Sequence, residues 1–306
     1  MQIYTQPIGL RDTYKNLVIA LGTFDGIHLG HQSVIRKAVN LARATKGMSM
    51  AFTFSDHPLL TIRPSFAPQK LRDNEEKARI MESLGLDILM NVAFHKDFAS
   101  ISPDGFLRFL EQHFAPRYLV VGPNYTFGFR GVGDGAFLQE HSSSYGFETI
   151  ICPPVEVNGE IVSSSRIRGL VVRGQLDEAN ALLGRPVSYA GIVIHGEARG
   201  RSIGFPTANI HLSDNYTILS NGVYVIEGEV DKETVRGIAN IGSNPTFDGV
   251  ERHIEVYLFD FDRDIYGRML RIRFLKRIRG EVKFPSPAAL IDQIHADVKK
   301  AKAVFA

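Results

Sequence analysis

The chain has 306 residues, 44% of them hydrophobic and 22% charged, and its formal net charge is +2. This length favours two domains over one, and the near-neutral charge argues against a protein that mainly binds nucleic-acid phosphates. The single cysteine, Cys152, excludes an intrachain disulfide, is expected to be a buried structural residue, and favours a reducing compartment, the cytoplasm.

Strand and helix signals alternate through the first half of the chain. Short apolar runs predict buried strands at residues 17–21, 48–54, 88–94, 118–121 and 147–152. Apolar residues at helical spacing predict helices at residues 31–45, 74–84 and 103–113. This alternation predicts a Rossmann-like α/β domain, a parallel sheet with helices on both faces. Ligands bind at the carboxyl ends of such strands, here residues 22–31, 54–58, 122–133 and the segment after Pro154.

The pattern changes near residue 183. A helix over residues 176–183 is expected to end at Gly184, with Pro186 just beyond it. Strand-like segments then follow at residues 188–195, 223–230, 234–241, 253–259 and 270–274, before an amphipathic helix at 286–304. This pattern predicts an antiparallel β-barrel with a terminal helix. We therefore place one domain at residues 1–183 and a second at 184–306.

Residues 22–31 read GTFDGIHLGH and lie between a predicted strand and a predicted helix. Glycines permit a tight turn there, and the free N–H groups of a helix N-terminus favour a phosphate. His28 and His31 share one face of the first turn, and Gly30 between them leaves space for a nucleotide. Two imidazoles so placed can donate hydrogen bonds to phosphate oxygens. The alternative is that the histidines only cap a loop. The further phosphate-site candidates are Gly22, Phe24 and Asp25.

This histidine motif resembles the HxGH signature of the nucleotidylyltransferases. The resemblance implies ATP binding and attack on the α-phosphate with release of pyrophosphate, and it requires a second phosphate-binding motif. Residues 163–168 (SSSRIR) would supply it, with hydroxyls from Ser163, Ser164 and Ser165 and a phosphate contact from Arg168. By itself, a serine-rich helix start is usually only a cap.

Longer segments narrow the resemblance. Residues 22–32, 52–58, 120–128 and 163–168 are similar to the FMN adenylyltransferase half of bacterial FAD synthetases. Residues 204–209 (GFPTAN), 240–244, 255–261 and 264–267 are similar to riboflavin kinases. Two details differ from the usual pattern: residue 165 is serine where threonine is common, and Arg130 stands one place early, which leaves its role open.

The segment before residue 210 carries the predicted phosphate and metal groups of the second domain. Glycines at 196 and 204, with Arg199 and Arg201, suit a loop that folds over the phosphates of a nucleotide (Gly196 and Gly204 as its flexible points), although an ordinary solvated loop is the alternative. Thr207 and Asn209 lie on one side of an extended segment and offer neutral oxygen ligands. The resemblance implies that they bind Mg²⁺.

Glu255 lies in a predicted strand of mostly apolar and aromatic residues. Period-two alternation permits it to face solvent while Ile254, Val256 and Leu258 face the core. The resemblance instead implies a general base that accepts the proton of the riboflavin 5′-hydroxyl.

The flavin ring requires a flat, apolar surface. The candidates follow strand ends in the first domain: Phe54, His57, Pro58, Asn124, Tyr125 and Phe127. Aromatic rings there suit the isoalloxazine, and core packing explains them nearly as well.

The resemblance implies a bifunctional enzyme that uses ATP, Mg²⁺, riboflavin and FMN and releases FAD. One alternative is a monofunctional nucleotidylyltransferase with a non-catalytic barrel. Another is an RNA-binding barrel whose basic face comprises Arg268, Arg271, Arg273, Lys276, Arg277 and Arg279. No nucleic-acid partner is expected, because the net charge is near neutral and the pattern lacks clustered exposed aromatic residues. No membrane span is expected either, because no run of about 18 apolar residues occurs. The sequence leaves self-association open.

Overall fold

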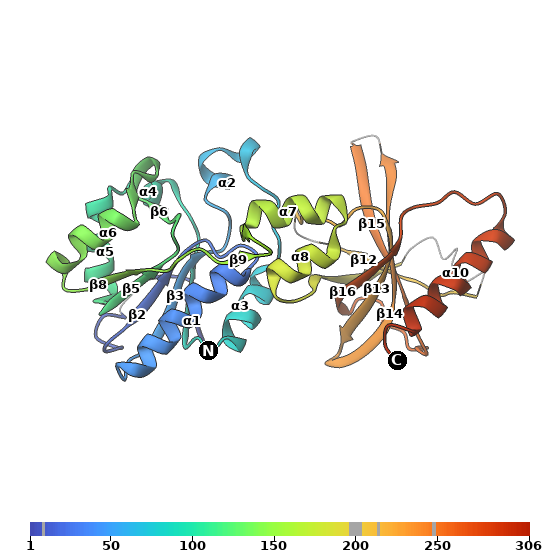
Figure 1. The fold of residues 1–306 in the computed structure, drawn as a ribbon, viewed down its shortest axis with the longest axis horizontal. Helices are drawn as coiled ribbons and strands as arrows, with labels where there is room; N and C mark the ends of the chain where they lie inside the picture. Colours follow the sequence, from blue (N-terminus) through green and yellow to red (C-terminus); the bar gives the residue numbers. More distant parts are fainter. Residues whose placement is uncertain (8–9, 196–203, 213–214, 247–248) are drawn as a thin grey trace. The chain divides into compact units, whose positions relative to one another are not determined.

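The computed structural model describes residues 1–7, 10–195, 204–212, 215–246 and 249–306. They form two compact units, Met1–Ser164 and Ser165–Ala306, each with its own sheet (Figure 1). The boundary between the two units thus falls close to residue 164, ahead of most of the last two helices of the predicted first domain. The domain boundary at 183/184 stays a prediction.

The first unit is built on a six-stranded sheet in the order β1-β4-β3-β2-β5-β8. Its strands are β1 (Gln2–Tyr4), β2 (Val18–Leu21), β3 (Ser49–Phe54), β4 (Ile88–Val92), β5 (Tyr118–Val121) and β8 (Glu148–Ile151). Every pairing is parallel, with Val18 opposite both Ser49 and Tyr118. The predicted parallel sheet is therefore confirmed, and β1 is an addition that its short sequence did not indicate.

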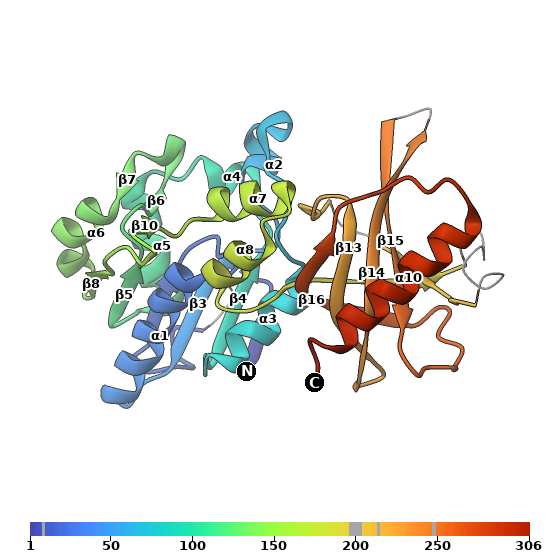
Figure 2. The same cartoon turned by 45° about the vertical axis from the view of Figure 1, so that its right-hand side comes forward.

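Alternate residues of each strand enter one of two cores. Ile19 and Leu21 pack on the face covered by α5 (Pro103–Phe114), whereas Val18 and Ala20 pack on the opposite face with α1 (Leu29–Ala44) and α3 (Asn74–Ser83). The second of these cores also contains Cys152, whose thiol has a pKa raised by burial. Helices on both faces, visible in Figure 2, confirm the predicted layers.

The helices begin at polar caps. The His28 ring caps α1, Asp73 accepts from Glu76 N at the start of α3, and Ser102 accepts from Gly105 N at the start of α5. Because His28 serves as this cap, α1 begins two residues earlier than the apolar spacing predicted.

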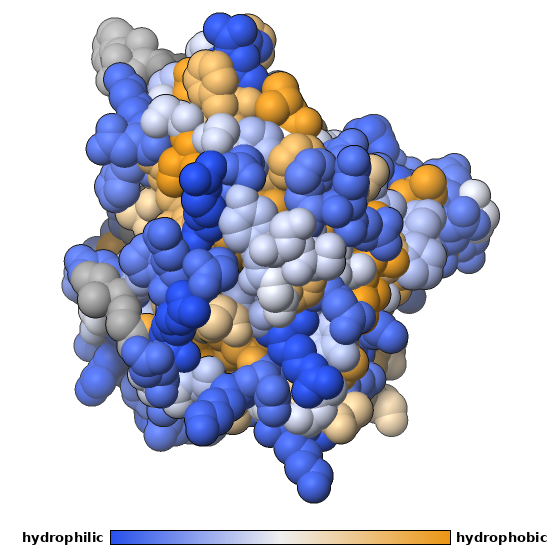
Figure 3. Space-filling view, turned by 90° about the vertical axis from the view of Figure 1, so that its left-hand side faces the viewer, coloured by the Kyte–Doolittle hydropathy of each residue, from blue (hydrophilic) through white to orange (hydrophobic). Residues whose placement is uncertain are grey.

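Short elements absent from the prediction fill the connections of the first unit. They are α2 (Leu59–Ile62), η1 (Pro64–Phe66), α4 (Lys96–Ala99), β6 (Thr126–Phe127), η2 (Phe129–Gly131), β7 (Gly133–Asp134), α6 (Gly135–His141), η3 (Ser142–Tyr145), β9 (Glu156–Val157) and β10 (Glu160–Ile161). Most span too few residues to show a periodic pattern. The face in Figure 3 is mainly hydrophilic, with small groups of apolar side chains between, as is ordinary for a protein surface.

Two helices precede the barrel of the second unit: α7 (Ser164–Arg173), which starts at the last residue of the first unit, and α8 (Leu176–Leu183). Gly184 has a φ of 68° at the end of α8, so the predicted C-cap is confirmed. Asn180 fixes α8 to the barrel, since its side chain donates to Phe274 O at 3.1 Å and accepts from Val187 N at 2.8 Å.

The barrel is closed and antiparallel, in the order β11-β12-β15-β14-β13-β16. Its strands are β11 (Val187–Ile194), β12 (Ala208–His211), β13 (Gly222–Val230), β14 (Glu233–Thr246), β15 (Gly249–Leu258) and β16 (Met269–Arg279). Helix α10 (Pro287–Lys302) packs outside it, where Arg279 Nε lies 2.8 Å from the buried carboxylate of Asp297. The predicted barrel and terminal helix are confirmed, and β12 is a strand where only a loop was expected.

Candidate functional site

A cavity of about 950 Å³ lies at the carboxyl ends of the strands in the first unit. Gly22, Phe54 and Gly122, which directly follow or end β2, β3 and β5, all line it, and so does Pro154. Each of the four segments predicted from the strand order thus contributes. The strand order reverses at β2, since β3 and β4 lie on one side of it and β5 and β8 on the other. Ligands of such sheets bind at this switch point, here between β2 and β5. The volume is at the upper end of ligand sites, about 300–1,000 Å³, and suits two substrates together.

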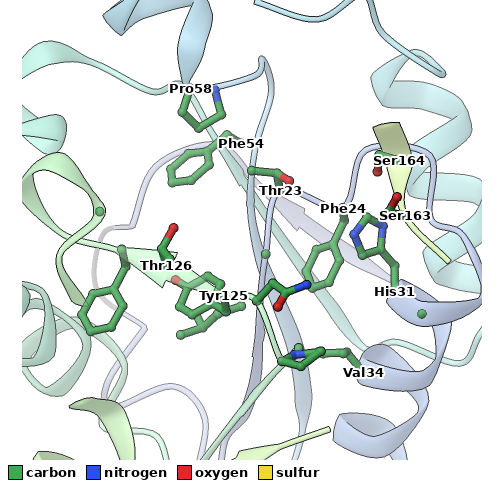
Figure 4. Close-up of a pocket in the computed structure, with 18 of the residues that line it drawn as sticks. Thr23, Phe24, His31, Val34, Phe54, Pro58, Tyr125, Thr126, Ser163 and Ser164 are labelled. Atoms are coloured by element: carbon green, nitrogen blue, oxygen red, sulfur yellow. The ribbon is translucent and has the colours of Figure 1, made fainter. Parts of the chain in front are cut away.

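The two histidines stand at one end of this cavity. Their rings stack with centroids 3.7 Å apart, and the side chain of His28 is 6% exposed. Nδ1 of His28 accepts the backbone N–H of His31 at 3.3 Å. A neutral His28 therefore carries its proton on Nε2, where it is a hydrogen-bond donor. Figure 4 shows His31 beside Ser163 at this end, with Phe54, Tyr125 and Thr126 at the other.

The loop that presents the histidines is strained. Phe24 and Ile27 have φ values of 48° and 38°, which side-chain-bearing residues rarely adopt. The buried ring of Phe24 meets His31 edge-on at 5.4 Å. A Cβ on Gly22 would lie 2.9 Å from the Phe24 ring, and a Cβ on Gly30 would lie 3.1 Å from Cε1 of His28. Gly30 thus leaves room for the His28 ring itself, in addition to any space it leaves for a nucleotide.

The serine motif at residues 163–168 contacts the histidine loop at residues 22–31 through a backbone carbonyl. Ser164 Oγ donates to Asp25 O at 2.8 Å, and both Ser163 and Ser164 line the cavity. Asp25 does not line it: this carboxylate lies behind the loop and accepts Leu71 N at 3.2 Å. Ser165 and Arg168 follow on α7, in the second unit.

Five of the six flavin candidates line the far end of the cavity: Phe54, Pro58, Asn124, Tyr125 and Phe127. The rings of Tyr125 and Phe127 are stacked at 5.8 Å, and burial raises the pKa of the Tyr125 phenol, so it stays neutral. His57 lies elsewhere, because its Nδ1 accepts Leu59 N at 3.2 Å and its side chain lines a small neighbouring hollow. Arg130, whose role was open, also lines the main cavity.

Several aromatic residues at this end escaped the sequence analysis. Phe94 and Phe98 line the cavity with Phe106 from α5, and the ring of Phe98 lies 5.6 Å from that of Phe54. The carboxyl end of β4 (Ile88–Val92) is the sequence feature that could have indicated Phe94. The strand predicted at 88–94 is two residues too long, which hid the loop that carries Phe94.

The predicted kinase residues share the outer face of the barrel. Asn209 on β12 lies opposite Glu255 on β15, and paired residues of antiparallel strands present their side chains on one face. Ile254 and Val256 are buried inside, at 1% and 0% exposure, while Glu255 is half-buried. Thr207 directly precedes β12 (Ala208–His211), and its spacing of two residues from Asn209 predicts the same face.

Neutral and carboxylate oxygens are the donors that Mg²⁺ prefers, so this set fits the ion. Gly204 precedes the set with a φ of 86° and is exposed. Gly196, Arg199 and Arg201 lie outside the described residues. In the described part of the chain, no group of three or more His, Cys, Asp and Glu side chains is placed to hold a metal.

Four arginines of β16 are buried or paired within the barrel unit, whereas Lys276 is exposed. Arg271 is 6% exposed, Arg273 lies 3.5 Å from Glu227, and Arg277 donates to Asn221 O at 3.1 Å. Arg279 is paired with Asp297 at 2.8 Å. Groups held in this way are poorly placed to contact RNA phosphates, which argues against the RNA-binding alternative.

The chain thus combines an α/β unit that has a histidine-lined cavity with a barrel unit that has an oxygen-rich outer face. The FAD synthetase family model matches residues 10–166, and the riboflavin kinase family model matches residues 183–305. The chain belongs to the family of bifunctional riboflavin kinases/FMN adenylyltransferases.

Relatives with that name match nearly the whole chain. The protein of Listeria monocytogenes is 40% identical, covering 95% of this chain and 93% of its own length. Those of Bacillus subtilis and Escherichia coli K12 are 38% and 33% identical, covering 97% and 95% of this chain and 95% and 93% of their own.

One similar crystal structure carries a different name. It is a macrolide-efflux protein from Streptococcus pneumoniae, with a TM-score of 0.90, 35% identity and 98% coverage of both chains. Among the described helices of this chain, none has the length and apolarity to cross a bilayer.

Proposed function

We propose that this chain makes FAD from riboflavin in two transfers from ATP. The barrel unit phosphorylates riboflavin to FMN, and the α/β unit adenylylates FMN to FAD and releases pyrophosphate. The observation that carries the proposal is that a histidine pair and an Asn209–Glu255 pair occur in one chain, each in the unit matched by the corresponding family model.

In the adenylyl transfer, an oxygen of the FMN phosphate forms a bond to the α-phosphorus of ATP, while the bond from that phosphorus to the departing pyrophosphate breaks. The nucleophile is already an anion, so no general base is needed. His28 and His31 donate hydrogen bonds where negative charge develops, and Ser164 and Arg168 add further donors. The remaining phosphate-side residues shape this end of the site: Gly22, Phe24, Asp25, Gly30, Ser163 and Ser165.

The flavin ring of FMN is proposed to occupy the aromatic end of the cavity. Phe54, Tyr125 and Phe127 supply ring faces, and Pro58 and Asn124 complete the lining. The two ends belong to one cavity, so the FMN phosphate can reach the histidine end while the ring stays at the other. His57 is proposed to act only by holding the turn into α2.

In the kinase transfer, Glu255 accepts the proton of the riboflavin 5′-hydroxyl as that oxygen attacks the γ-phosphorus of ATP and ADP leaves. Thr207 and Asn209 would hold Mg²⁺. When bound, the ion neutralises charge on the ATP phosphates. Gly196, Arg199, Arg201 and Gly204 are proposed to enclose those phosphates.

The alternatives have less support. A non-catalytic barrel would not need Thr207, Asn209 and Glu255 on one face. An RNA-binding barrel would need the arginines that β16 uses internally. Small molecules are therefore the proposed partners, with no nucleic acid and no membrane, and the cytoplasm is the proposed location.

Incubation of the protein with riboflavin, ATP and Mg²⁺, followed by chromatographic separation of the flavins, tests the proposal. FMN is expected first and FAD later, with ADP and pyrophosphate as the nucleotide products. FMN supplied directly should yield FAD without ADP. Formation of neither flavin product would overturn the proposal, and formation of FMN alone would overturn the assignment of the α/β unit.

A further inference from the structure

A buried lysine lies behind the adenylyl-transfer site. Lys77, in the first turn of α3, is 6% exposed, and its Nζ donates to Phe54 O at 2.8 Å. Phe54 ends β3 and lines the aromatic end of the cavity. The ammonium itself does not line the cavity; it lies in the small hollow behind the loop that follows β2. Lys77 therefore contacts the backbone of the flavin side without reaching the flavin.

Charged groups from three segments face this ammonium. Asp25 comes from the loop after β2, Asp56 from the turn after β3, and Lys70 and Arg72 from the chain leading into α3. Asp56 is already paired with Lys70, Nζ to Oδ1 at 3.1 Å. Asp25 is the group that most strongly favours the charged form of Lys77. The ammonium thus has a carboxylate counter-charge on the phosphate side of the site.

Asp25 extends the contact to the second phosphate motif. Its carboxylate accepts Leu71 N at 3.2 Å, and its backbone carbonyl accepts the hydroxyl of Ser164 at 2.8 Å. Asp25 therefore contacts the chain leading into α3 through its side chain and Ser164 through its backbone. Lys77 faces the carboxylate at one end of Asp25, and the cavity-lining Ser164 is bound at the other.

Resting on the adenylyl transfer proposed above, we propose that Lys77 is a positioning residue for that step, whose ammonium holds the Phe54 carbonyl on the flavin side and attracts the Asp25 carboxylate on the phosphate side. It touches neither substrate. It keeps the distance between the two ends of the cavity fixed, so that the FMN phosphate lies at reacting distance from the α-phosphorus of ATP. Displacements of about 1 Å at such a site can lower a rate by about 10²-fold.

Burial of the positive charge of Lys77 is not expected to stabilise the fold. Burial lowers the pKa of Lys77 to about 8, against the attraction of Asp25. An ammonium that is taken out of water lowers stability unless its partners fully compensate it, and an apolar side chain of similar length would avoid that loss. Methionine avoids that loss but leaves the Phe54 carbonyl without its donor, so arginine, which keeps a charged donor, is the variant that separates the two effects.

The lowered pKa of Lys77 predicts that raising the pH has opposite effects on stability and on activity. Between the folded pKa of about 8 and the ordinary 10.5, the unfolded chain holds the Lys77 proton more often than the folded one. The contribution of Lys77 to the free energy of unfolding therefore rises as the pH rises through this window. Over the same window the folded protein loses the positioning charge, so the rate of adenylyl transfer falls.

Kinetics of FAD formation from supplied FMN test the proposal, with Lys77→Met, Lys77→Arg and, as control, Arg79→Met. Arg79 is an exposed residue of the same helix, paired with Glu75 at 3.0 Å. For Lys77→Met we expect kcat at pH 7 to fall by about 30-fold with KM changed less than about threefold, because geometry and not affinity is lost. Its thermal midpoint at pH 7 should fall only slightly, because the Phe54 carbonyl loses its donor while the cost of burying the charge is removed. The riboflavin kinase activity of this variant and both activities of Arg79→Met should match the unmodified protein.

The pH profile supplies the second readout. In the unmodified protein kcat should decline as the pH passes about 8, the Met variant should lack this step, and the Arg variant, which stays charged, should recover activity and lack the step as well. An unchanged kcat in Lys77→Met would overturn the proposal. So would a loss that matches a lowered thermal midpoint while the alkaline decline persists. If the Met variant does not fold, an alkaline decline retained in Lys77→Arg would overturn it.

Discussion

The two sites are built on opposite principles. In the α/β unit the side chains proposed to act lie on loops at strand ends, where Phe24 and Ile27 have left-handed φ values. In the barrel they stand on the strands themselves, where Asn209 and Glu255 are fixed by ordinary antiparallel pairing. A loop site depends on the contacts that support it, whereas a strand site depends on register. Substitutions should therefore separate the two activities and show different sensitivities.

The sharpest separation is expected at Glu255. Glu255→Gln keeps the shape of the side chain and the strand register but removes the base, so riboflavin phosphorylation should fall by about 10³-fold. FAD formation from supplied FMN should not change. Flavin chromatography with each substrate in turn measures both rates. Glu233→Gln, an exposed position on β14, is the matched control. A Gln variant that still phosphorylates riboflavin at the original rate would show that Glu255 is only a solvent-facing strand residue.

His28 should give the reverse separation. Asn is a good helix cap, so His28→Asn preserves an acceptor for the His31 N–H while removing the imidazole donor. FAD formation should fall by about 10²-fold because one donor to the transition state is lost. FMN formation should persist, and the thermal midpoint should change little. Equal loss of both activities would contradict the independence of the two units.

The contrast between the sites also explains what the sequence could predict. The barrel strands, the C-cap at Gly184 and the alternation around Glu255 follow from period-two patterning and local backbone chemistry. The histidine loop was found because its residues are contiguous. Phe98 and Phe106 were not found, since they reach the cavity from α4 and α5 through tertiary packing. Lys77 was not found either, because it contacts the Phe54 carbonyl from α3, behind the cavity. Residue spacing along the chain carries no information about such contacts.

Stability should also differ between the units. Asp297 is 1% exposed and pairs with Arg279, so Asp297→Ala leaves a partly buried guanidinium without its counter-charge. We expect a loss of about 3 kcal/mol in the free energy of unfolding of the barrel. Heating should then inactivate riboflavin phosphorylation at a lower temperature, with the inactivation curve of FAD formation unchanged. Asp292→Ala, exposed on the same helix, should leave both curves in place. Joint inactivation would mean that the units unfold together.

Gly30→Ala is the smallest change and tests how tightly the loop site is supported. The added methyl would lie 3.1 Å from Cε1 and 3.2 Å from Nδ1 of His28. That ring is buried and stacked on His31 at 3.7 Å, so it cannot move away without disturbing the pair. We expect FAD formation to fall by about tenfold through kcat, because the donors are misplaced and not removed. Stability should change little, because the contact with the His28 ring offsets a gain in helix propensity of at most about 1 kcal/mol.

Gly280→Ala in the barrel is the counterpart, because its Cβ would meet only Arg277 Nη2, at 3.7 Å. It should leave riboflavin phosphorylation unchanged. Kinetics and thermal unfolding of both variants complete the measurement. If Gly30→Ala keeps its rate of FAD formation, the histidine end tolerates displacement, and the site on loops is no more dependent on its supporting contacts than the site on strands.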